Sequence, residues 1–201
     1  MTRISGSLIT FNPAIERLKK NIDAITPQVT NLIIVDNGST NFDQILEICK
    51  WQDNIIIIAN KTNTGIACAL NQAFRKSISL GCDLTLTLDQ DSVSPPNLIE
   101  ILETYQGDRV GIICPLIVDI NRMHNEVPVE GTTKLHRCIS SGSLTSNYAW
   151  GFINGFDEEM FIDGVDFDFC DRLIKSGFEI IRVNYVKLIH EIGKIEMKSF
   201  L

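Results

Sequence analysis

The sequence lacks the features that mark zinc-binding, secreted or membrane-spanning proteins. None of its six cysteines forms a Cys-x-x-Cys pair, which argues against a zinc ribbon and a thioredoxin-like motif. The amino terminus has no apolar stretch long enough for a signal-peptide core, and no run of about 18 apolar residues occurs to span a bilayer. We therefore expect a cytoplasmic protein with reduced cysteines, and peripheral contact with the inner face of the cytoplasmic membrane stays open.

Acidic residues outnumber basic residues in the sequence. The 201 residues include 18 lysines and arginines against 25 aspartates and glutamates, which gives a formal net charge of -7. This balance argues against a nucleic-acid partner, because phosphates require a basic face. A small anionic ligand remains compatible, since a bound metal ion can invert the local electrostatics.

The first half of the chain alternates apolar, β-branched runs with segments of helical periodicity. Strands are predicted at residues 4–10, 31–35, 55–59 and 83–88. Helices are predicted after Asn12-Pro13 and at residues 43–51, 65–80 and 94–105. This order predicts an α/β fold with a mostly parallel central sheet and helices on both faces.

The second half is less regular. Strands are predicted at residues 110–114, 138–145 and 178–183, and a helix at residues 164–176. Between the first two of these strands lies a polar stretch, residues 119–137, with weak periodicity. A connection this long inside a compact domain is usually functional or mobile.

Carboxylates follow two of the predicted strands. Asp89 and Asp91 come directly after the fourth strand, and Asp36 follows the second. Ligands of parallel sheets bind where the strands end at their carboxyl side, and Mg²⁺ or Mn²⁺ prefers oxygen ligands and bridges to diphosphates. The alternative is that Asp89 and Asp91 only cap the next helix. Their convergence with Asp36 favours a metal site.

The order and spacing of several short motifs resemble the inverting glycosyltransferases of family 2, which have the GT-A fold. The motifs are Thr-Phe-Asn-Pro at 10–13, Val-Asp-Asn-Gly-Ser at 35–39, Asn-Thr-Gly at 63–65 with Asn71, Leu-Asp-Gln-Asp-Ser at 88–92, Ser-Ser-Gly-Ser at 140–143, Asn-Gly-Phe-Asp at 154–157, residues 161–172, and His190 with Gly193. Residues 161–170 resemble the rhamnosyltransferase branch most, whose donor is dTDP-rhamnose. The resemblance implies sugar transfer from a dTDP- or UDP-linked donor to a saccharide acceptor, lipid-linked or free, in bacterial surface polysaccharide synthesis.

The resemblance also implies roles for the residues at the strand ends. Asp36 would contact the donor base, and Thr10 would lie on the wall of the same pocket. Gly65 would allow close approach of the nucleotide. Asp89 would face the ribose and the metal, and Asp91 would bind the Mg²⁺ or Mn²⁺ ion that neutralises the diphosphate.

An inverting transfer needs a general base, and residues 157–171 hold seven carboxylates and no lysine or arginine. Most of these carboxylates fit a solvated loop and helix start. Asp163 and Asp166 differ, because one helical turn separates them and places them on one face among phenylalanines. The family usually has Glu-Asp here with the Asp as base, which aligns Asp166 with the base and Val165 with the Glu. Asp163 is the second choice.

The resemblance covers nearly the whole chain and implies one GT-A domain over residues 1–201. Residues 1–105 would bind the nucleotide sugar, and residues 106–201 would form the acceptor side. His190 would be a further metal or phosphate contact, or a histidine at a strand end whose hydrogen bonds are satisfied within the protein. Family members commonly continue well beyond the histidine strand, so a chain ending at Leu201 implies a truncated or a minimal form.

Two other functions stay open. A nucleotidyltransferase of related fold usually carries a glycine-rich basic loop after the first strand, whereas this chain has Phe11-Asn12-Pro13 there. A non-catalytic relative would bind a nucleotide sugar without turnover, and the acidic residues at the predicted metal and base positions argue against it.

Overall fold

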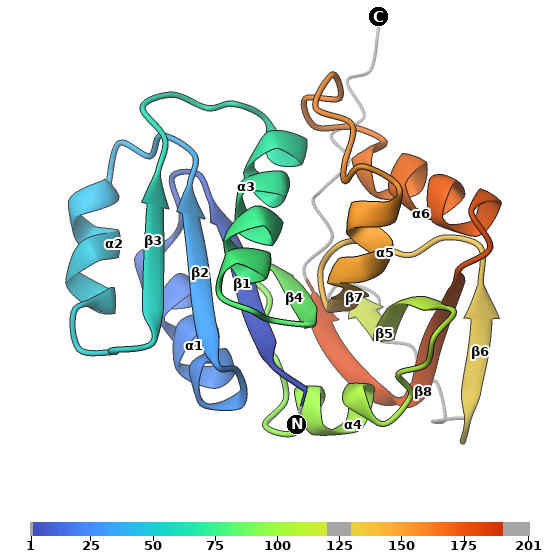
Figure 1. Cartoon of the computed structure of the whole chain (residues 1–201). Helices are drawn as coiled ribbons and strands as arrows, with labels where there is room; N and C mark the ends of the chain where they lie inside the picture. The colour runs from blue at the N-terminus through green and yellow to red at the C-terminus, as the bar shows by residue number, and fades with distance from the viewer. Residues whose placement is uncertain (1, 120–129, 191–201) are drawn as a thin grey trace, which may run out of the picture.

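Residues 2–119 and 130–190 are described by the computed structural model, and within them eight strands form one mixed sheet in the order β3-β2-β1-β4-β7-β5-β8-β6 (Figure 1). The strands are β1 (Ile4–Thr10), β2 (Asn31–Asp36), β3 (Ile55–Ala59), β4 (Leu84–Asp89), β5 (Val110–Asp119), β6 (Thr132–Leu135), β7 (Ser143–Ser146) and β8 (Glu179–His190). The helices are α1 (Ile15–Ile25), the short 3-10 helix η1 (Thr26–Gln28), α2 (Phe42–Cys49), α3 (Ile66–Ser79), α4 (Leu98–Glu103), α5 (Asn147–Phe152) and α6 (Val165–Lys175).

Helices cover both faces of the sheet, which confirms the predicted α/β class. On one face, α1, α2 and α4 bury residues such as Leu18, Ile45 and Leu98 in a common core. On the other face, α3, α5 and α6 pack around Phe74 and Phe169. Strands buried on both faces read as continuous apolar runs, which is why their positions could be predicted from composition alone.

The parallel strands β3, β2, β1 and β4 determine where a ligand can bind. Their registers place Thr10 beside Asp36 and Ile9 beside Asp89. The carboxyl ends of β1, β2 and β4 therefore meet at one edge of the sheet. This is the edge at which ligands of open α/β sheets bind.

Two elements were not predicted, two were placed wrongly, and β5 and β8 extend well beyond the predicted residues 110–114 and 178–183. The strand β6 lies inside the stretch expected to be irregular, and α5 follows β7 directly. The predicted helix at residues 94–105 begins only at Leu98, because prolines 95 and 96 lack backbone N–H groups and favour extended conformations before them. The predicted strand at residues 138–145 shrinks to β7, since Ser143 N–H donates to Ser140 O (3.0 Å) and closes a turn.

The turn at residues 140–142 joins the two halves of the sheet. Gly142 N–H donates to Thr87 O (2.7 Å), and the Thr87 hydroxyl donates to Ser140 O. Gly142 has a φ of +83°, and a Cβ added there would lie 2.7 Å from a Leu188 methyl carbon and 3.0 Å from the Pro115 ring. Both the backbone conformation and the close contact therefore require glycine.

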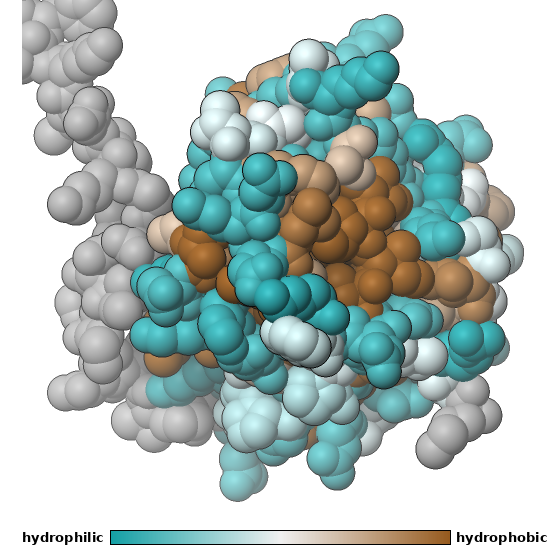
Figure 2. All heavy atoms as spheres, turned by 90° about the vertical axis from the view of Figure 1, so that its left-hand side faces the viewer, coloured by the Kyte–Doolittle hydropathy of each residue, from teal (hydrophilic) through white to brown (hydrophobic). Residues whose placement is uncertain are grey.

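Figure 2 views the molecule from the side of α2 and β3, and hydrophobic residues gather there among hydrophilic ones. All six cysteines are free, and most are buried. Among the helices that the structure describes, none is long and apolar enough to cross a membrane.

Two glycine substitutions separate the effect of the close contact from that of the backbone conformation. Gly131 has a φ of +89° but has open space around its Cβ position, so Gly131→Ala should cost about 1–2 kcal/mol from the left-handed conformation alone. Gly142→Ala should cost about 1–3 kcal/mol more because the added methyl overpacks the core. Urea unfolding of both variants measures this difference, and equal losses would contradict the assignment.

Candidate active site

A cleft of about 460 Å³ opens at the carboxyl ends of β1, β2 and β4. Its lining comes from five separate segments of the chain. The residues are Ile9, Phe11, Asn37, Asn63, Gly65, Ile66, Asp89, Gln90, Asp91, Phe161 and Ile162. Three of the sequence-predicted site residues, Gly65, Asp89 and Asp91, therefore line one cavity.

Asp36 and Thr10 are adjacent to the cleft but are not among its lining residues. Asp36 is 1 % exposed, and its carboxylate accepts hydrogen bonds from the Thr10 hydroxyl (3.0 Å), Gly38 N–H (3.2 Å) and Ser39 N–H (3.0 Å). The carboxylate thus fixes the turn that follows β2. That turn presents the next residue, Asn37, to the cleft.

Asn37 ties this turn to the loop before α3. Its Nδ2 donates to Asn63 Oδ1 (2.8 Å), and its Oδ1 accepts from Thr64 N–H (3.0 Å). Both asparagines stand in motifs noted from the sequence, but neither was assigned a role. Asparagines in turn sequences have many local uses, so composition alone does not identify the two that face a cavity.

Gly65 lies in close contact with the backbone of Phe161. It has a φ of +85°, and a Cβ there would lie 2.7 Å from Phe161 O. Ile66 N–H donates to the same carbonyl at 2.7 Å. Gly65 therefore allows the segment carrying Phe161 and Ile162 to lie against the start of α3, which closes one side of the cleft.

The turn containing Asp89 and Asp91 is held through its backbone. Asn21 Nδ2 donates to Asp89 O and Arg17 Nε donates to Asp91 O, both at 2.7 Å. Both anchors lie on α1, so the helix fixes the turn. Ser141 Oγ accepts from Asp89 N–H at 3.1 Å on the other side.

The side chains of Asp89 and Asp91 fit a divalent cation that shares its coordination with a ligand. Within residues 2–119 and 130–190, no three His, Cys, Asp or Glu side chains form a group that could hold a metal by themselves. Mg²⁺ commonly binds through one or two carboxylates, with phosphate and water oxygens completing the shell. Two carboxylates in one cleft match this arrangement.

The structure separates Asp163 from Asp166. Gly164, at the N-cap of α6, has a φ of +79° and is left-handed, so the helix begins at Val165 and leaves Asp163 outside it. The prediction that both carboxylates share a helical face is therefore wrong. Asp163 is exposed in the preceding loop, whereas Asp166 lies in the first turn of the helix.

Asp166 faces a second, much smaller cavity of about 10 Å³, which Thr87, Ser140 and Cys170 also line. Burial raises the pKa of its carboxyl group, and hydrogen bonds from the backbone and side chain of Ser140 oppose that rise. The burial expected for a general base is present, although the cause is desolvation rather than neighbouring negative charge. Asp166 does not line the larger cleft. In the turn at residues 140–142, Ser140 lines the small cavity and Ser141 Oγ accepts from the N–H of Asp89, which lines the large one.

Neighbouring carboxylates of α6 have other partners. Asp168 pairs with Arg172 (2.7 Å), and Asp171 pairs with Arg137 (2.6 Å), which lowers the pKa of the Asp171 carboxyl group. Both pairs fix side chains on the outer part of the helix. Asp166 is thus the α6 carboxylate that turns inwards towards the β4 strand.

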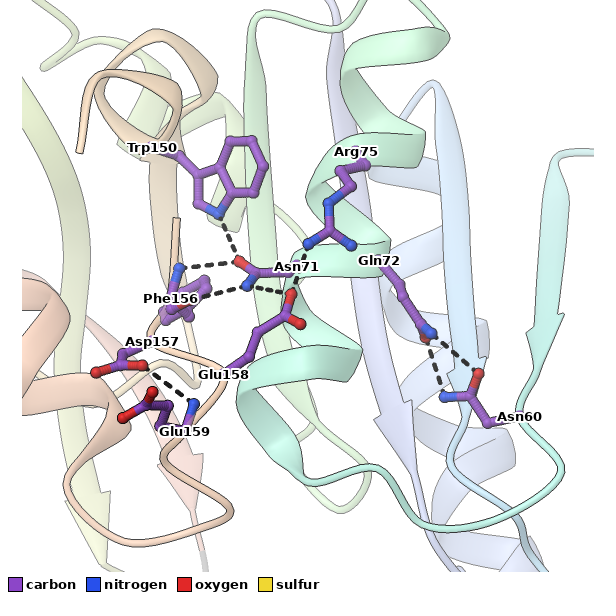
Figure 3. A network of polar contacts seen from close by, with 9 residues as sticks. All are labelled: Asn60, Asn71, Gln72, Arg75, Trp150, Phe156, Asp157, Glu158 and Glu159. Carbon is purple, nitrogen blue, oxygen red and sulfur yellow. Dashed lines mark hydrogen bonds and ion pairs between the residues drawn. The ribbon is translucent and has the colours of Figure 1, made fainter. Parts of the chain in front are cut away.

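A network centred on Asn71 attaches residues 150–159 to α3 (Figure 3). The Asn71 amide oxygen accepts from Trp150 Nε1 (3.2 Å) and Phe156 N–H (2.9 Å), and its nitrogen donates to Phe156 O (2.8 Å) and a Glu158 carboxylate oxygen (2.9 Å). Arg75 binds the same carboxylate oxygen at 2.5 Å, and the Asn71 bond and Arg75 together lower the pKa of Glu158. Trp150 also stacks on Phe74 with ring centroids 5.4 Å apart.

This network fixes one end of the segment that closes the cleft. A Cβ at Gly155 would lie 2.6 Å from the Asn71 amide oxygen, so glycine is needed for the contact. The segment then runs to Phe161, whose carbonyl binds the start of α3. Asn71 and the Gly65 region thus hold the segment at both ends against one helix.

His190 ends strand β8, but its side chain lies outside the described residues. The predicted metal or phosphate contact at His190 therefore stays a prediction. The serines at 140 and 141 were part of a recognised motif without an assigned role. Their contacts become apparent only when β7 pairs with β4.

Asn71→Leu and Arg75→Ala test which part of the network stabilises the fold. Asn71→Leu leaves buried backbone and indole groups without partners, so we expect a loss of about 2–4 kcal/mol in the free energy of unfolding. Arg75→Ala removes an exposed ion pair and should cost less than about 1 kcal/mol. Chemical denaturation of both variants gives the comparison, and a larger loss for Arg75→Ala would refute the assignment.

Comparisons with known proteins identify the family of this chain. Residues 8–165 match the sequence family described as glycosyl transferase family 2. The chain is 29% identical to the dTDP-rhamnosyl transferase RfbF of Shigella flexneri over 217 residues, which covers 98% of this chain and 72% of that protein.

Solved structures resemble this one in fold. A structure of GalNAc-T7 with UDP, GalNAc and Mn²⁺ has a TM-score of 0.79 at 12% identity and covers 96% of this chain and 44% of its own. Staphylococcus aureus TarS has a TM-score of 0.77 at 14% identity, covering 95% of this chain and 37% of its own. This chain therefore spans less than half of either solved chain. The fold is that of the GT-A glycosyltransferases, and the chain belongs to glycosyl transferase family 2.

Proposed function

We propose that this glycosyltransferase transfers rhamnose, with inversion, from a dTDP-linked donor to a saccharide acceptor. One observation carries the proposal: Asp89 and Asp91 line the same 460 Å³ cleft as Asn37, Asn63 and Gly65, at the carboxyl edge of the parallel strands. The similarity to a dTDP-rhamnosyl transferase supports the choice of donor.

The donor diphosphate would lie beside Asp91, with Asp89 between the ion and the ribose. Mg²⁺ or Mn²⁺ held by these carboxylates would neutralise the diphosphate as it leaves. The GalNAc-T7 structure, which contains UDP and Mn²⁺, has a similar fold and supports the use of a divalent cation. Asp36, through Thr10 and the turn that contains Asn37, would shape the pocket for the base. The domain would then use residues 1–105 for the donor and residues 106–201 for the acceptor.

Asp166 would act as the general base. Its carboxylate would take the proton of an acceptor hydroxyl while the hydroxyl oxygen attacks the anomeric carbon from the face opposite the diphosphate. Burial raises the pKa of Asp166, which makes the carboxylate a stronger base than an exposed aspartate. Asp163, exposed in the loop before α6, is the alternative base.

The acceptor and its location complete the proposal. We infer a growing surface polysaccharide, lipid-linked at the inner face of the cytoplasmic membrane, from the resemblance to the rhamnosyltransferase branch. Glycosyltransferase family membership favours sugar transfer over the nucleotidyltransferase alternative.

Calorimetric titration of dTDP and UDP tests the donor site. With Mn²⁺ or Mg²⁺ present we expect binding, with dTDP tighter, and loss of affinity in EDTA. Asp91→Ala should weaken binding at least tenfold, about 1.4 kcal/mol, because the diphosphate loses its bridged cation. Asp108→Ala removes an exposed carboxylate before β5 and is the matched control. A folded protein that binds neither nucleotide under any of these conditions would refute the donor site.

Substitution of Asp166 distinguishes an effect on the rate of transfer from an effect on nucleotide binding. Asp166→Asn should lower the rate of transfer by about 10²–10⁴-fold and leave nucleotide affinity unchanged. Asp163→Asn is the matched control and should keep most activity.

The raised pKa of Asp166 also sets the pH dependence. Transfer by the unmodified protein should fall as the pH drops through that pKa, which lies above the ordinary value of 3.8. The raised pKa means that folding disfavours the ionised form, so Asp166→Asn should not reduce thermal stability at neutral pH. If Asp163→Asn abolishes transfer and Asp166→Asn does not, the assignments are reversed.

A further inference from the structure

Three side-chain amides line the large cleft, those of Asn37, Asn63 and Gln90. Gln90 lies between Asp89 and Asp91 in the turn after β4, on the side proposed for the diphosphate. Asn37 follows β2, and Asn63 lies in the loop between β3 and α3. Because β1 separates β2 from β4 in the sheet, a nucleotide with its diphosphate at the end of β4 has its base on the side of the two asparagines.

Backbone N–H groups fix the orientation of the Asn37 and Asn63 amides. An amide side chain has an oxygen that accepts and a nitrogen that donates, and a backbone N–H can bind only the oxygen. Thr64 N–H donates to Asn37 Oδ1 (3.0 Å), and Gly65 N–H donates to Asn63 Oδ1 (2.9 Å). Each amide is therefore held in one orientation, because turning it over would place two donors against each other.

The Asn37 amide makes all its hydrogen bonds within the protein. Its Oδ1 also accepts from Asn60 Nδ2 (3.1 Å), and Asn60 forms a reciprocal amide pair with Gln72 of α3 (Figure 3). Its Nδ2 donates to Asn63 Oδ1 (2.8 Å) and to Gly65 O (3.2 Å). The contribution of Asn37 is therefore to position Asn63.

The Asn63 amide has an occupied oxygen and an available nitrogen. Its Oδ1 accepts from both Asn37 Nδ2 and Gly65 N–H. Its Nδ2 donates to no group within residues 2–119 and 130–190. Asn63 is half-buried and lines the cleft. It therefore offers a bound ligand a hydrogen-bond donor of fixed orientation, and its acceptor is already occupied.

We propose that Asn63 selects a pyrimidine base with a carbonyl group at C4, as in uracil and thymine, by donating from Nδ2 to that carbonyl oxygen. This inference rests on the donor site proposed above. The C4 atom lies across the pyrimidine ring from the nitrogen that carries the ribose. With the ribose directed towards Asp89, C4 therefore points to the side of the sheet on which Asn63 lies.

Cytosine is disfavoured by the same contact. It carries an amino group at C4, where uracil and thymine have a carbonyl oxygen. The amino group would place a donor against Asn63 Nδ2, and both groups would lose their hydrogen bonds to water without gaining a partner. The selection therefore combines an attractive contact with the accepted bases and a repulsive contact with the rejected one.

Calorimetric titration of UDP and CDP, which differ only in the base, measures this selection. In Mg²⁺ the unmodified protein should bind UDP about tenfold or more tightly than CDP. Asn63→Asp keeps an oxygen for Asn37 and Gly65 but replaces the donor nitrogen by a second acceptor. The ratio of the two dissociation constants should therefore shift about tenfold or more towards CDP. Both nucleotides carry the same diphosphate, so the added negative charge affects them alike and cancels in the ratio.

Two further measurements complete the test. Asn97→Asp makes the same change at the exposed N-cap of α4 and should leave the ratio unchanged. The nucleotide 4-thio-UDP has sulfur, a weaker acceptor, in place of the C4 oxygen, and should bind the unmodified protein about threefold or more weakly than UDP. Asn63→Asp should lose this preference, because a carboxylate cannot donate.

The outcomes distinguish this inference from the donor site on which it rests. An unchanged preference for UDP over CDP in Asn63→Asp would overturn the inference and leave the donor site intact. So would equal binding of UDP and 4-thio-UDP by the unmodified protein, which decides the matter even if the variant does not fold. A folded, unmodified protein that binds no nucleotide would refute the donor site and the inference together.

Discussion

The hydrogen bonds between residues 140–142 and strand β4 are the constraint on which the site depends. The Thr87 hydroxyl binds Ser140 O, Gly142 N–H binds Thr87 O, and Ser141 Oγ accepts from Asp89 N–H. Ser140 also binds the Asp166 carboxylate. A single turn therefore fixes the carboxylates at the end of β4 relative to the buried carboxylate of α6, although these lie far apart in the sequence.

A second connection acts on the other side of the cleft. Asn71 binds the start of the closing segment, and the backbone of Phe161 binds its end to the first turn of α3. Both connections consist mainly of buried, uncharged hydrogen bonds, which salt screens much less than exposed ion pairs. The relative position of the two sides of the cleft is therefore set by packing and hydrogen bonding, while exposed pairs such as Arg75–Glu158 contribute little.

The sequence predicts those elements whose signal is local. Strand β3 was predicted with its observed bounds, because a doubly buried parallel strand reads as an apolar run between turn residues. The aspartates at 89 and 91 were placed correctly at a strand end for the same reason. In contrast, the insertion of β7 between β4 and β5 depends on antiparallel pairing of distant segments. No local sequence pattern predicts that pairing. For this reason the lengths of the second-half strands were predicted wrongly, and the short strand β6 and the helix α5 were not predicted.

The same limit applies to the chemistry of the site. Asp163 and Asp166 are both aspartates and lie three positions apart, so the sequence alone does not distinguish them. Gly164 has a left-handed conformation, and the helix begins after it, so only Asp166 enters the helix. Burial then raises the pKa of Asp166, and Ser140 moderates the rise. The opposing effect comes from a serine 26 positions away in the sequence, so it can be seen only in the folded chain.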